Sequence, residues 1–200
     1  MRRLSPLCRM LAVLWLLPCA AALAHHHHDG KLRGLADTTV LIVRHAEKPA
    51  HGTGLAPAGQ ARAQAYVRYF ESFAVDGQPL RPDTLVATAD SRHSDRPELT
   101  LQPLAQALGL PIDDRFDDQQ AKELAGMLEQ QPHGRVVLIC WHHGEVPKLV
   151  HALGGDPSAL LPHGKWPSKV FGWVLVLRYD HQGYLASAQR IDEHLMPDDR

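Results

Sequence analysis

The chain has 200 residues, 22% of them charged, and a formal net charge of −1 at pH 7 with histidine counted as neutral. This length can bury one sizeable hydrophobic core, so a single main domain is expected. The near-balanced charge, without a basic run, gives no reason to expect a nucleic-acid partner.

Residues 1–24 have the pattern of a secretory signal peptide. Arginines precede an apolar run, which ends in the small-residue sequence Ala22-Leu23-Ala24. That run is too short to form a stable bilayer-spanning helix. We therefore predict cleavage after Ala24 and export to the periplasm or the extracellular space, with no stable membrane anchor. A retained N-terminal anchor is the alternative.

Cleavage would leave Cys140 as the only cysteine, so the mature chain would have no intramolecular disulfide and would depend on its core for stability. The next feature is the cluster His25–His28. Clustered imidazoles bind transition metals, but a tail without fixed geometry is the simpler interpretation. We predict a flexible, histidine-containing segment over residues 25–37 and one domain over residues 38–200.

Beyond residue 37, short apolar runs alternate with longer amphipathic stretches. The first half of the domain predicts a strand buried on both faces over 38–43, a helix over 56–73, a strand over 83–89 and a helix over 98–110. Pro57 suits the first turn of its helix, and Gly109 suits the end of the next one.

The second half begins with a polar segment over 113–118, which we interpret as a loop leading into a helix over 117–131. A very apolar strand over 134–141 and a helix over 144–155 follow, and the chain ends in a hairpin over 170–180 and 184–191. This alternation predicts a three-layer α/β/α sandwich with a largely parallel central sheet.

Ligands of such sheets bind beyond the carboxyl ends of the strands. Basic residues follow three of the predicted strands: Arg44-His45, then Arg92, His93 and Arg96, then His142-His143. Guanidinium groups match phosphate oxygens in pairs, and a neutral imidazole can attack phosphorus. Phosphoryl transfer needs mainly positioning and charge neutralisation, so this set predicts a phosphate site that requires no metal.

The motifs in the chain resemble the histidine phosphatase superfamily, the phosphoglycerate mutase-like group. LIVRHAEKP (41–49) resembles an R-H-A-E-K-P variant of its first signature, and GLAPAGQARA (54–63) resembles the helix that follows. DSRHSDRPELTLQPLAQALG (90–109) places Arg96 and Thr100 in register, VVLICWHHGEVPKLVHALG (136–154) resembles the segment with the second histidine, and WPSKVFGWVLVL (166–177) resembles the late strand. The resemblance covers roughly Thr38 to Arg190 and implies a phosphoglycerate mutase-like fold.

The resemblance also implies roles for individual residues. His45 would be the nucleophile that becomes phosphohistidine, and Arg44 and Arg96 would clamp the phosphoryl group. Spacing to the PKLV sequence favours His142 as the second catalytic histidine, although His143 departs from the family pattern and keeps that choice open. Further phosphate-binding or rim positions are His143, Arg92 and Lys48.

The general acid is the least defined member of the site. Family members often use a carboxyl in the segment that here reads PIDDRFDDQQ, which makes Asp113, Asp114 and Asp117 the candidates. A carboxyl kept protonated in the pocket would suit the role. Each of the three also fits a plain polar loop.

Together these features predict an exported phosphatase that hydrolyses phosphate monoesters and needs no metal or cofactor. Its short loops suggest an open site for small phosphoesters or phosphorylated protein side chains. The alternative is a catalytically weak phosphate-binding or regulatory module with the same fold. Cys140, within an apolar strand, is interpreted as a small core residue.

Overall fold

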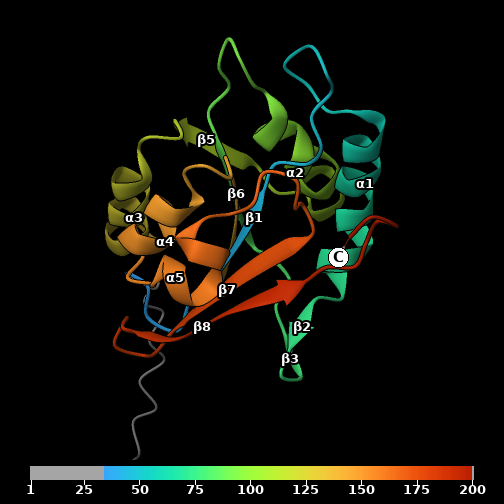
Figure 1. Ribbon diagram of the computed structural model, residues 1–200. Coiled ribbons are helices and arrows are strands. Elements are labelled where there is room, and N and C mark those ends of the chain that lie inside the picture. Colours follow the sequence, from blue (N-terminus) through green and yellow to red (C-terminus); the bar gives the residue numbers. More distant parts are fainter. Residues whose placement is uncertain (1–33, 200) are drawn as a thin grey trace, which may run out of the picture.

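The computed structural model describes residues 34–199. Its centre is a six-stranded sheet in the order β5-β4-β6-β1-β7-β8, with helices packed on both faces (Figure 1). Four strands run parallel: β1 (Thr39–Arg44), β4 (Thr84–Thr88), β5 (Ile112–Phe116) and β6 (Val136–Trp141). An antiparallel hairpin of β7 (Trp173–Tyr179) and β8 (Leu185–Asp192) completes the sheet. The predicted three-layer fold with a largely parallel sheet is confirmed.

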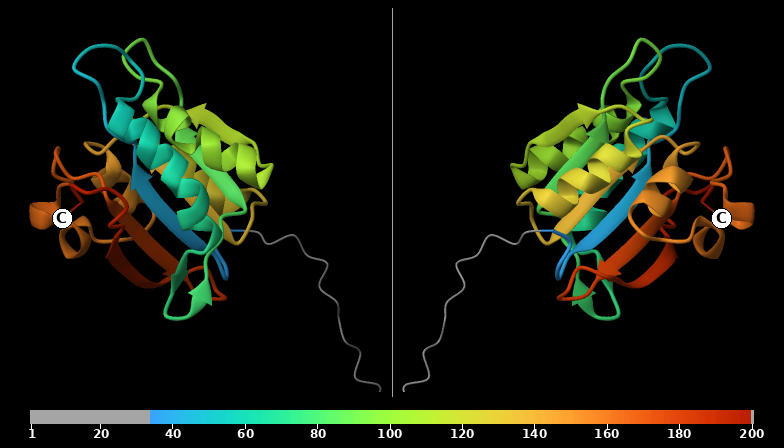
Figure 2. Two further views of the ribbon diagram at one scale, coloured as in Figure 1. Left: turned by 90° about the vertical axis from the view of Figure 1, so that its right-hand side faces the viewer. Right: turned by 90° about the vertical axis from the view of Figure 1, so that its left-hand side faces the viewer.

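Two helical layers bury the faces of this sheet (Figure 2). One layer consists of α1 (Pro57–Glu71) and α2 (Arg96–Leu108), and the other of α3 (Ala121–Gln130), α4 (Val146–Ala152) and α5 (Pro157–Leu160). Alternate residues of β1 divide between them, because Leu41 packs with the α1–α2 core and Ile42 with the α3–α4 core. Burial on both faces explains the uninterrupted apolar run that predicted this strand.

The clearest difference from the prediction lies at residues 112–116, where the expected polar loop is the edge strand β5. A partly exposed edge strand needs no apolar alternation, so its sequence IDDRF carried no strand signal. The structure also contains a small hairpin of β2 (Ala74–Val75) and β3 (Gln78–Pro79) and a 3-10 turn η1 (Pro162–Gly164), neither of which was predicted. The predicted signal peptide and His25–His28 lie outside the described residues.

Residues 34–37 form a turn that packs on the domain. Leu35 is buried in the α3–α4 core, and the Asp37 backbone N–H donates to the carbonyl of Asp180 at 2.9 Å. Cys140 is fully buried in β6, in agreement with its interpretation as a core residue. Across residues 34–199, no helix is long and apolar enough to cross a membrane.

The parallel strands β1, β4 and β6 end at one edge of the sheet. The loops over 45–56 and 89–95 rise from this edge at the top of Figure 1. The fold therefore gathers the three basic strand ends predicted from the sequence at one place.

Candidate phosphate-binding and catalytic site

His45 lies at the end of β1 and is almost completely buried. Its Nδ1 lies 2.8 Å from the Ala46 carbonyl oxygen, which can only accept, so Nδ1 carries the proton and the lone pair is on Nε2. Burial lowers the pKa of His45 to about 3, and the nearby charge of Arg44 adds to this shift. The imidazole is therefore neutral at physiological pH, which is the form that can act as a nucleophile.

The Ala46 peptide group that orients His45 is itself held in place. Its N–H donates to the Thr100 hydroxyl at 2.9 Å, and that hydroxyl donates to the Arg96 carbonyl at 2.7 Å. Thr100 is fully buried on α2. The two hydrogen bonds of Thr100 thus connect α2 to the peptide group that orients His45.

Arg44 lies beside His45 with its guanidinium partly engaged. Nη1 donates to backbone carbonyls of residues 167, 168 and 170, the shortest contact being 2.8 Å, and the guanidinium carbon lies 3.9 Å from the centre of the Phe171 ring. Burial lowers the pKa of Arg44 to about 10, far enough above neutral pH for it to stay charged. Its Nε is buried and has no hydrogen-bond partner among the described residues.

Arg96 begins α2 and contributes a second free donor. Its Nη1 donates to the Thr53 carbonyl at 2.9 Å, whereas its buried Nε has no partner within residues 34–199. The charge of Arg96 acts on both His45 and His142 and lowers their pKa values. Buried N–H groups without partners are rare in native proteins, so Nε of Arg44 and Nε of Arg96 indicate a place for an anion.

His142 and His143 both reach the site from the end of β6. The His142 ring centre lies 5.1 Å from that of His45, and the His143 ring centre lies at 6.2 Å. Arg44 Nη2 lies 3.3 Å from Nδ1 of His143, and since a guanidinium only donates, His143 accepts there and carries its proton on Nε2. His142 is the nearer ring, and Arg44 forms no hydrogen bond with its nitrogens in the described part of the chain. The choice of His142 as the second catalytic histidine stays a prediction.

Burial lowers the pKa of both His142 and His143, and for His143 the pKa falls to about 4. Both imidazoles are therefore neutral at physiological pH in the protein without ligand. The negative charge of Asp118 opposes the shift at His142, and Asp118 was not among the residues singled out from the sequence.

The three candidate acids lie on β5, or directly after it in the case of Asp117. Asp113 forms an ion pair with Arg115 at 2.7 Å, and the hydrogen bond from Arg115 lowers the Asp113 pKa. Asp114 is exposed, and Asp117 is exposed with its carboxylate accepting from the Gln119 N–H at 2.8 Å. Within the described part of the chain, none of the three forms a hydrogen bond or ion pair with His45 or His142.

The remaining rim candidates differ in their placement. Lys48 is exposed, and its charge contributes to the lowered pKa of His143. Arg92 is exposed and donates to the neighbouring His93 ring at 2.8 Å. Within residues 34–199, no group of three or more His, Cys, Asp or Glu side chains is arranged to hold a metal ion.

The described part of the chain shares its arrangement of elements with solved structures, three of which carry phosphatase names. The chain superposes on the alpha-ribazole phosphatase of Shigella flexneri with a TM-score of 0.54 and 14% identity, covering 79% of this chain and 97% of that one. A protein assigned as the phosphohistidine phosphatase SixA of Agrobacterium tumefaciens gives 0.51 and 19%, covering 78% and 97%. Phosphoserine phosphatase from Entamoeba histolytica, in complex with 3-phosphoglyceric acid, gives 0.50 and 14%, covering 80% and 100%.

The chain has the fold of the histidine phosphatase superfamily. No family profile and no curated protein matches the sequence, so the likeness was found through the structure. In this histidine phosphatase fold, the described basic residues occupy the edge where the parallel strands end.

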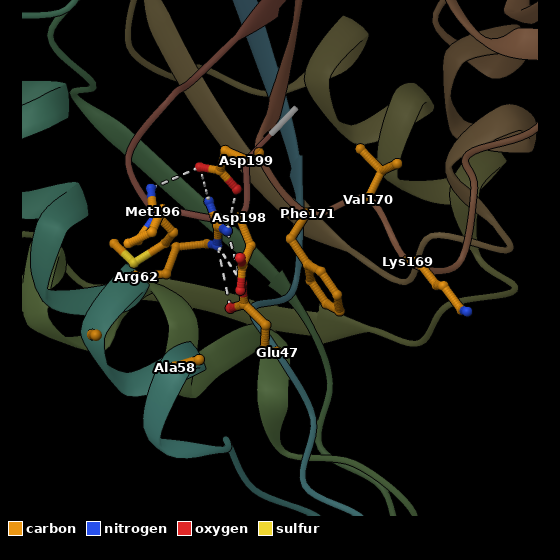
Figure 3. Close-up of a pocket in the computed structure, with 12 residues that line it drawn as sticks. Glu47, Ala58, Arg62, Lys169, Val170, Phe171, Met196, Asp198 and Asp199 are labelled. Carbon is orange, nitrogen blue, oxygen red and sulfur yellow. Dashed lines mark hydrogen bonds and ion pairs between the residues drawn. The ribbon is translucent and has the colours of Figure 1, made fainter.

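A cluster of charges beside the site was not anticipated from the sequence. Arg62 of α1 is buried and binds the carboxylates of Glu47, Glu193 and Asp199 (Figure 3). A cavity of about 570 Å³ lies next to this cluster and is lined in part by Phe171, whose ring also stacks on Arg44. Arg62 lies in a helix whose periodicity predicts only that it is amphipathic, so no local signal marks it as a charge centre.

Proposed function

We propose that the chain is an exported phosphatase that hydrolyses phosphate monoesters through a phosphohistidine intermediate on His45. The observation that carries this proposal is the juxtaposition of a neutral imidazole with a free Nε2 and two buried guanidinium N–H groups without partners. The fold shared with several phosphatases supports it.

The reaction divides into two displacements at phosphorus. Nε2 of His45 attacks, the N–P bond forms as the bond to the leaving oxygen breaks, and that oxygen takes a proton from an acid or from water. Water then attacks phosphorus, the N–P bond breaks with its electron pair returning to His45, and inorganic phosphate leaves. Arg44 and Arg96 would neutralise the oxygens throughout, with His142 as a further donor.

The test is hydrolysis of an aryl phosphate by purified protein. His45→Ala should abolish turnover, whereas His151→Ala, an exposed histidine of α4, serves as the matched control and should retain it. Retention of full activity by His45→Ala would overturn the proposal. A panel of small phosphoesters and phosphorylated amino acids, with phosphohistidine included, would then define the substrate class.

Export is tested separately. The N-terminus of the protein recovered from an expressing cell should begin directly after Ala24, and protein that keeps residues 1–24 would contradict the proposed cleavage.

A phosphate-binding module without turnover is the second candidate. It is favoured by the position of Asp113, Asp114 and Asp117, of which the first is ion-paired and the other two are exposed. This candidate predicts that inorganic phosphate binds and that no member of the substrate panel is hydrolysed. Calorimetric titration with phosphate, beside the hydrolysis assay, distinguishes the two.

A further inference from the structure

The five N–H donors of Arg62 are all engaged by carboxylates. Nε and Nη2 bind Glu47, with the shortest contact at 2.7 Å, and Nη1 binds Glu193 at 3.0 Å. Asp199 bridges both terminal nitrogens, at 2.6 Å to Nη2 and 3.0 Å to Nη1. Arg62, on helix α1, thus joins the loop after His45 to the stretch 193–199, which lies far away in the sequence.

The Glu47 end of this cluster leads directly to the nucleophile. Glu47 is the second residue after His45, and the intervening Ala46 carbonyl accepts from Nδ1 of His45 at 2.8 Å. The Glu47 backbone is also fixed, because its carbonyl accepts from the Ala56 N–H at 2.8 Å. At Gly59 a Cβ atom would come within 2.5 Å of that carbonyl, so helix α1 can lie this close only because the residue is glycine.

The other end of the cluster anchors the C-terminal stretch. Asp199 accepts not only from Arg62 but also from the backbone N–H groups of Leu195 and Met196, both at 2.9 Å. Glu193 is buried, and its second carboxylate oxygen accepts from the Tyr66 hydroxyl at 2.9 Å. Figure 3 shows Arg62 pointing between Glu47 and Asp199. The stretch 193–199 is therefore part of the wall that supports the loop carrying His45.

We infer that Arg62 is a positioning residue through which the stretch 193–199 holds the Ala46–Glu47 backbone, and with it the His45 imidazole, in the geometry needed for attack. The inference rests on the proposed role of His45. It assigns Glu47 to this support rather than to contact with substrate, and it makes Asp199 a determinant of the chemical step although it does not touch the substrate.

The test compares two neighbouring aspartates. Asp199→Asn removes the charge that binds Arg62, while Asp198→Asn is the matched control, because Asp198 is exposed and its side chain forms no hydrogen bond or ion pair within residues 34–199. Because small misplacement of a reacting group is costly, we expect Asp199→Asn to lower kcat about 10-fold with KM unchanged. Asp198→Asn should behave as the parent protein. Equal kcat values for the two variants would overturn the inference.

A double-mutant cycle separates positioning from a general loss of stability. Glu47→Gln acts at the other side of Arg62 and should also lower kcat, and its combination with Asp199→Asn should lower kcat by less than the product of the two effects. Independent, multiplicative effects would contradict a single path through Arg62. Measured at a temperature well below unfolding of every variant, this result cannot arise from loss of folded protein.

A measurement that needs no turnover distinguishes failure of this inference from failure of the proposed function. The Nδ1 proton of His45 should give an NMR signal that shifts or exchanges faster in Asp199→Asn and not in Asp198→Asn. If the protein hydrolyses no substrate, the proposed function fails while this signal still decides the positioning role. An unchanged signal in Asp199→Asn would overturn it.

Discussion

Arg44 and Arg62 are both almost completely buried, at 2% and 1% exposure, yet their guanidinium groups meet opposite surroundings. Arg44 faces backbone carbonyls, an imidazole and an aromatic ring, with Nε left over. Arg62 faces three carboxylates that use every donor. Accordingly, burial lowers the pKa of Arg44, whereas at Arg62 the effect of burial is outweighed by the hydrogen bonds that the guanidinium donates to Asp199 and Glu47, which raise its pKa.

This contrast separates two uses of a buried cation. A guanidinium without a carboxylate partner keeps its charge available for an incoming anion, and the cost of burying it is offset when phosphate binds. A guanidinium saturated by carboxylates can bind nothing more and serves to hold segments together. Arg44 directly precedes His45, and Arg62 binds the Glu47 carboxylate, so one arginine would act on the substrate and the other on the scaffold.

The largest expected effect is on stability at Arg62. Arg62→Met keeps the bulk of the side chain but leaves the buried Glu193 and the partly buried Glu47 and Asp199 without their cation, which should lower the free energy of unfolding by about 3–5 kcal/mol. Urea unfolding measures this change. Arg68→Met, an exposed position on the same helix, is the control and should have little effect. Equal losses of unfolding free energy in Arg62→Met and Arg68→Met would mean that the carboxylate contacts of Arg62 do not stabilise the fold.

Arg44 should show the opposite profile. Arg44→Lys keeps the positive charge but loses the planar arrangement of guanidinium donors, so we expect kcat/KM for an aryl phosphate to fall about 100- to 1,000-fold. The free energy of unfolding should change less than for Arg62→Met. Arg135→Lys, at an exposed site before β6, is the control. A large loss of stability with normal turnover would mean that Arg44, too, is chiefly structural.

Thr100 sharpens the comparison because it supports the same loop by a neutral contact. Thr100→Val preserves shape but leaves the Ala46 N–H without an acceptor, at an expected cost of about 1–3 kcal/mol in unfolding free energy. Thr88→Val is a matched control, since Thr88 is equally buried and its hydroxyl has no partner in the described residues. If both variants unfold alike, the Thr100 hydrogen bond contributes nothing to the loop.

The pH dependence of stability should have opposite signs in the two regions. Burial raises the pKa of Glu193 to about 8 against 4.5 for an ordinary glutamate, despite the facing charge of Arg62. The folded protein then retains a proton that the unfolded chain releases. The contribution of Glu193 is fully present below pH 4.5 and is lost as pH rises through about 8, with a slope of at most about 1.4 kcal/mol per pH unit.

Glu193→Gln should flatten this alkaline slope in unfolding experiments between pH 5 and 8. His45 behaves in reverse, because its pKa of about 3 lies below the ordinary 6.5, so its contribution is present above pH 6.5 and is lost as pH falls toward 3. His45→Asn should flatten the acidic slope only. The groups that face Glu193 are Arg62, Asp199 and Tyr66. None of them titrates between pH 5 and 8, because the pKa values of Arg62 and Tyr66 are raised from already high values and the pKa of Asp199 is lowered. An unchanged alkaline slope in Glu193→Gln would therefore contradict the raised pKa of Glu193.

Much of the candidate site could be predicted because the sequence patterns that mark its strands are local. Uninterrupted apolar runs marked β1 and β6 as strands buried on both faces, and the residues directly after them had to emerge at one sheet edge. The structure brings His45, His142 and Arg44 together there, as expected. Strand β5 was not predicted because a partly exposed edge strand carries no apolar alternation. Asp113 and Asp114 were therefore expected in a loop, whereas the structure places them in a strand.

The sequence by itself determined the strands other than β2, β3 and β5, the main helices and the identity of the basic residues at the strand ends, because period and local composition encode them. Only the tertiary structure decided that Arg44 keeps an N–H without a partner among the described residues, whereas carboxylates accept from every donor of Arg62. Arg62 meets Glu193 and Asp199 across separations of 131 and 137 residues, and Arg44 meets the carbonyl of Val170 across 126. Such contacts depend on how segments that are distant in the sequence pack together, and no local sequence pattern predicts them.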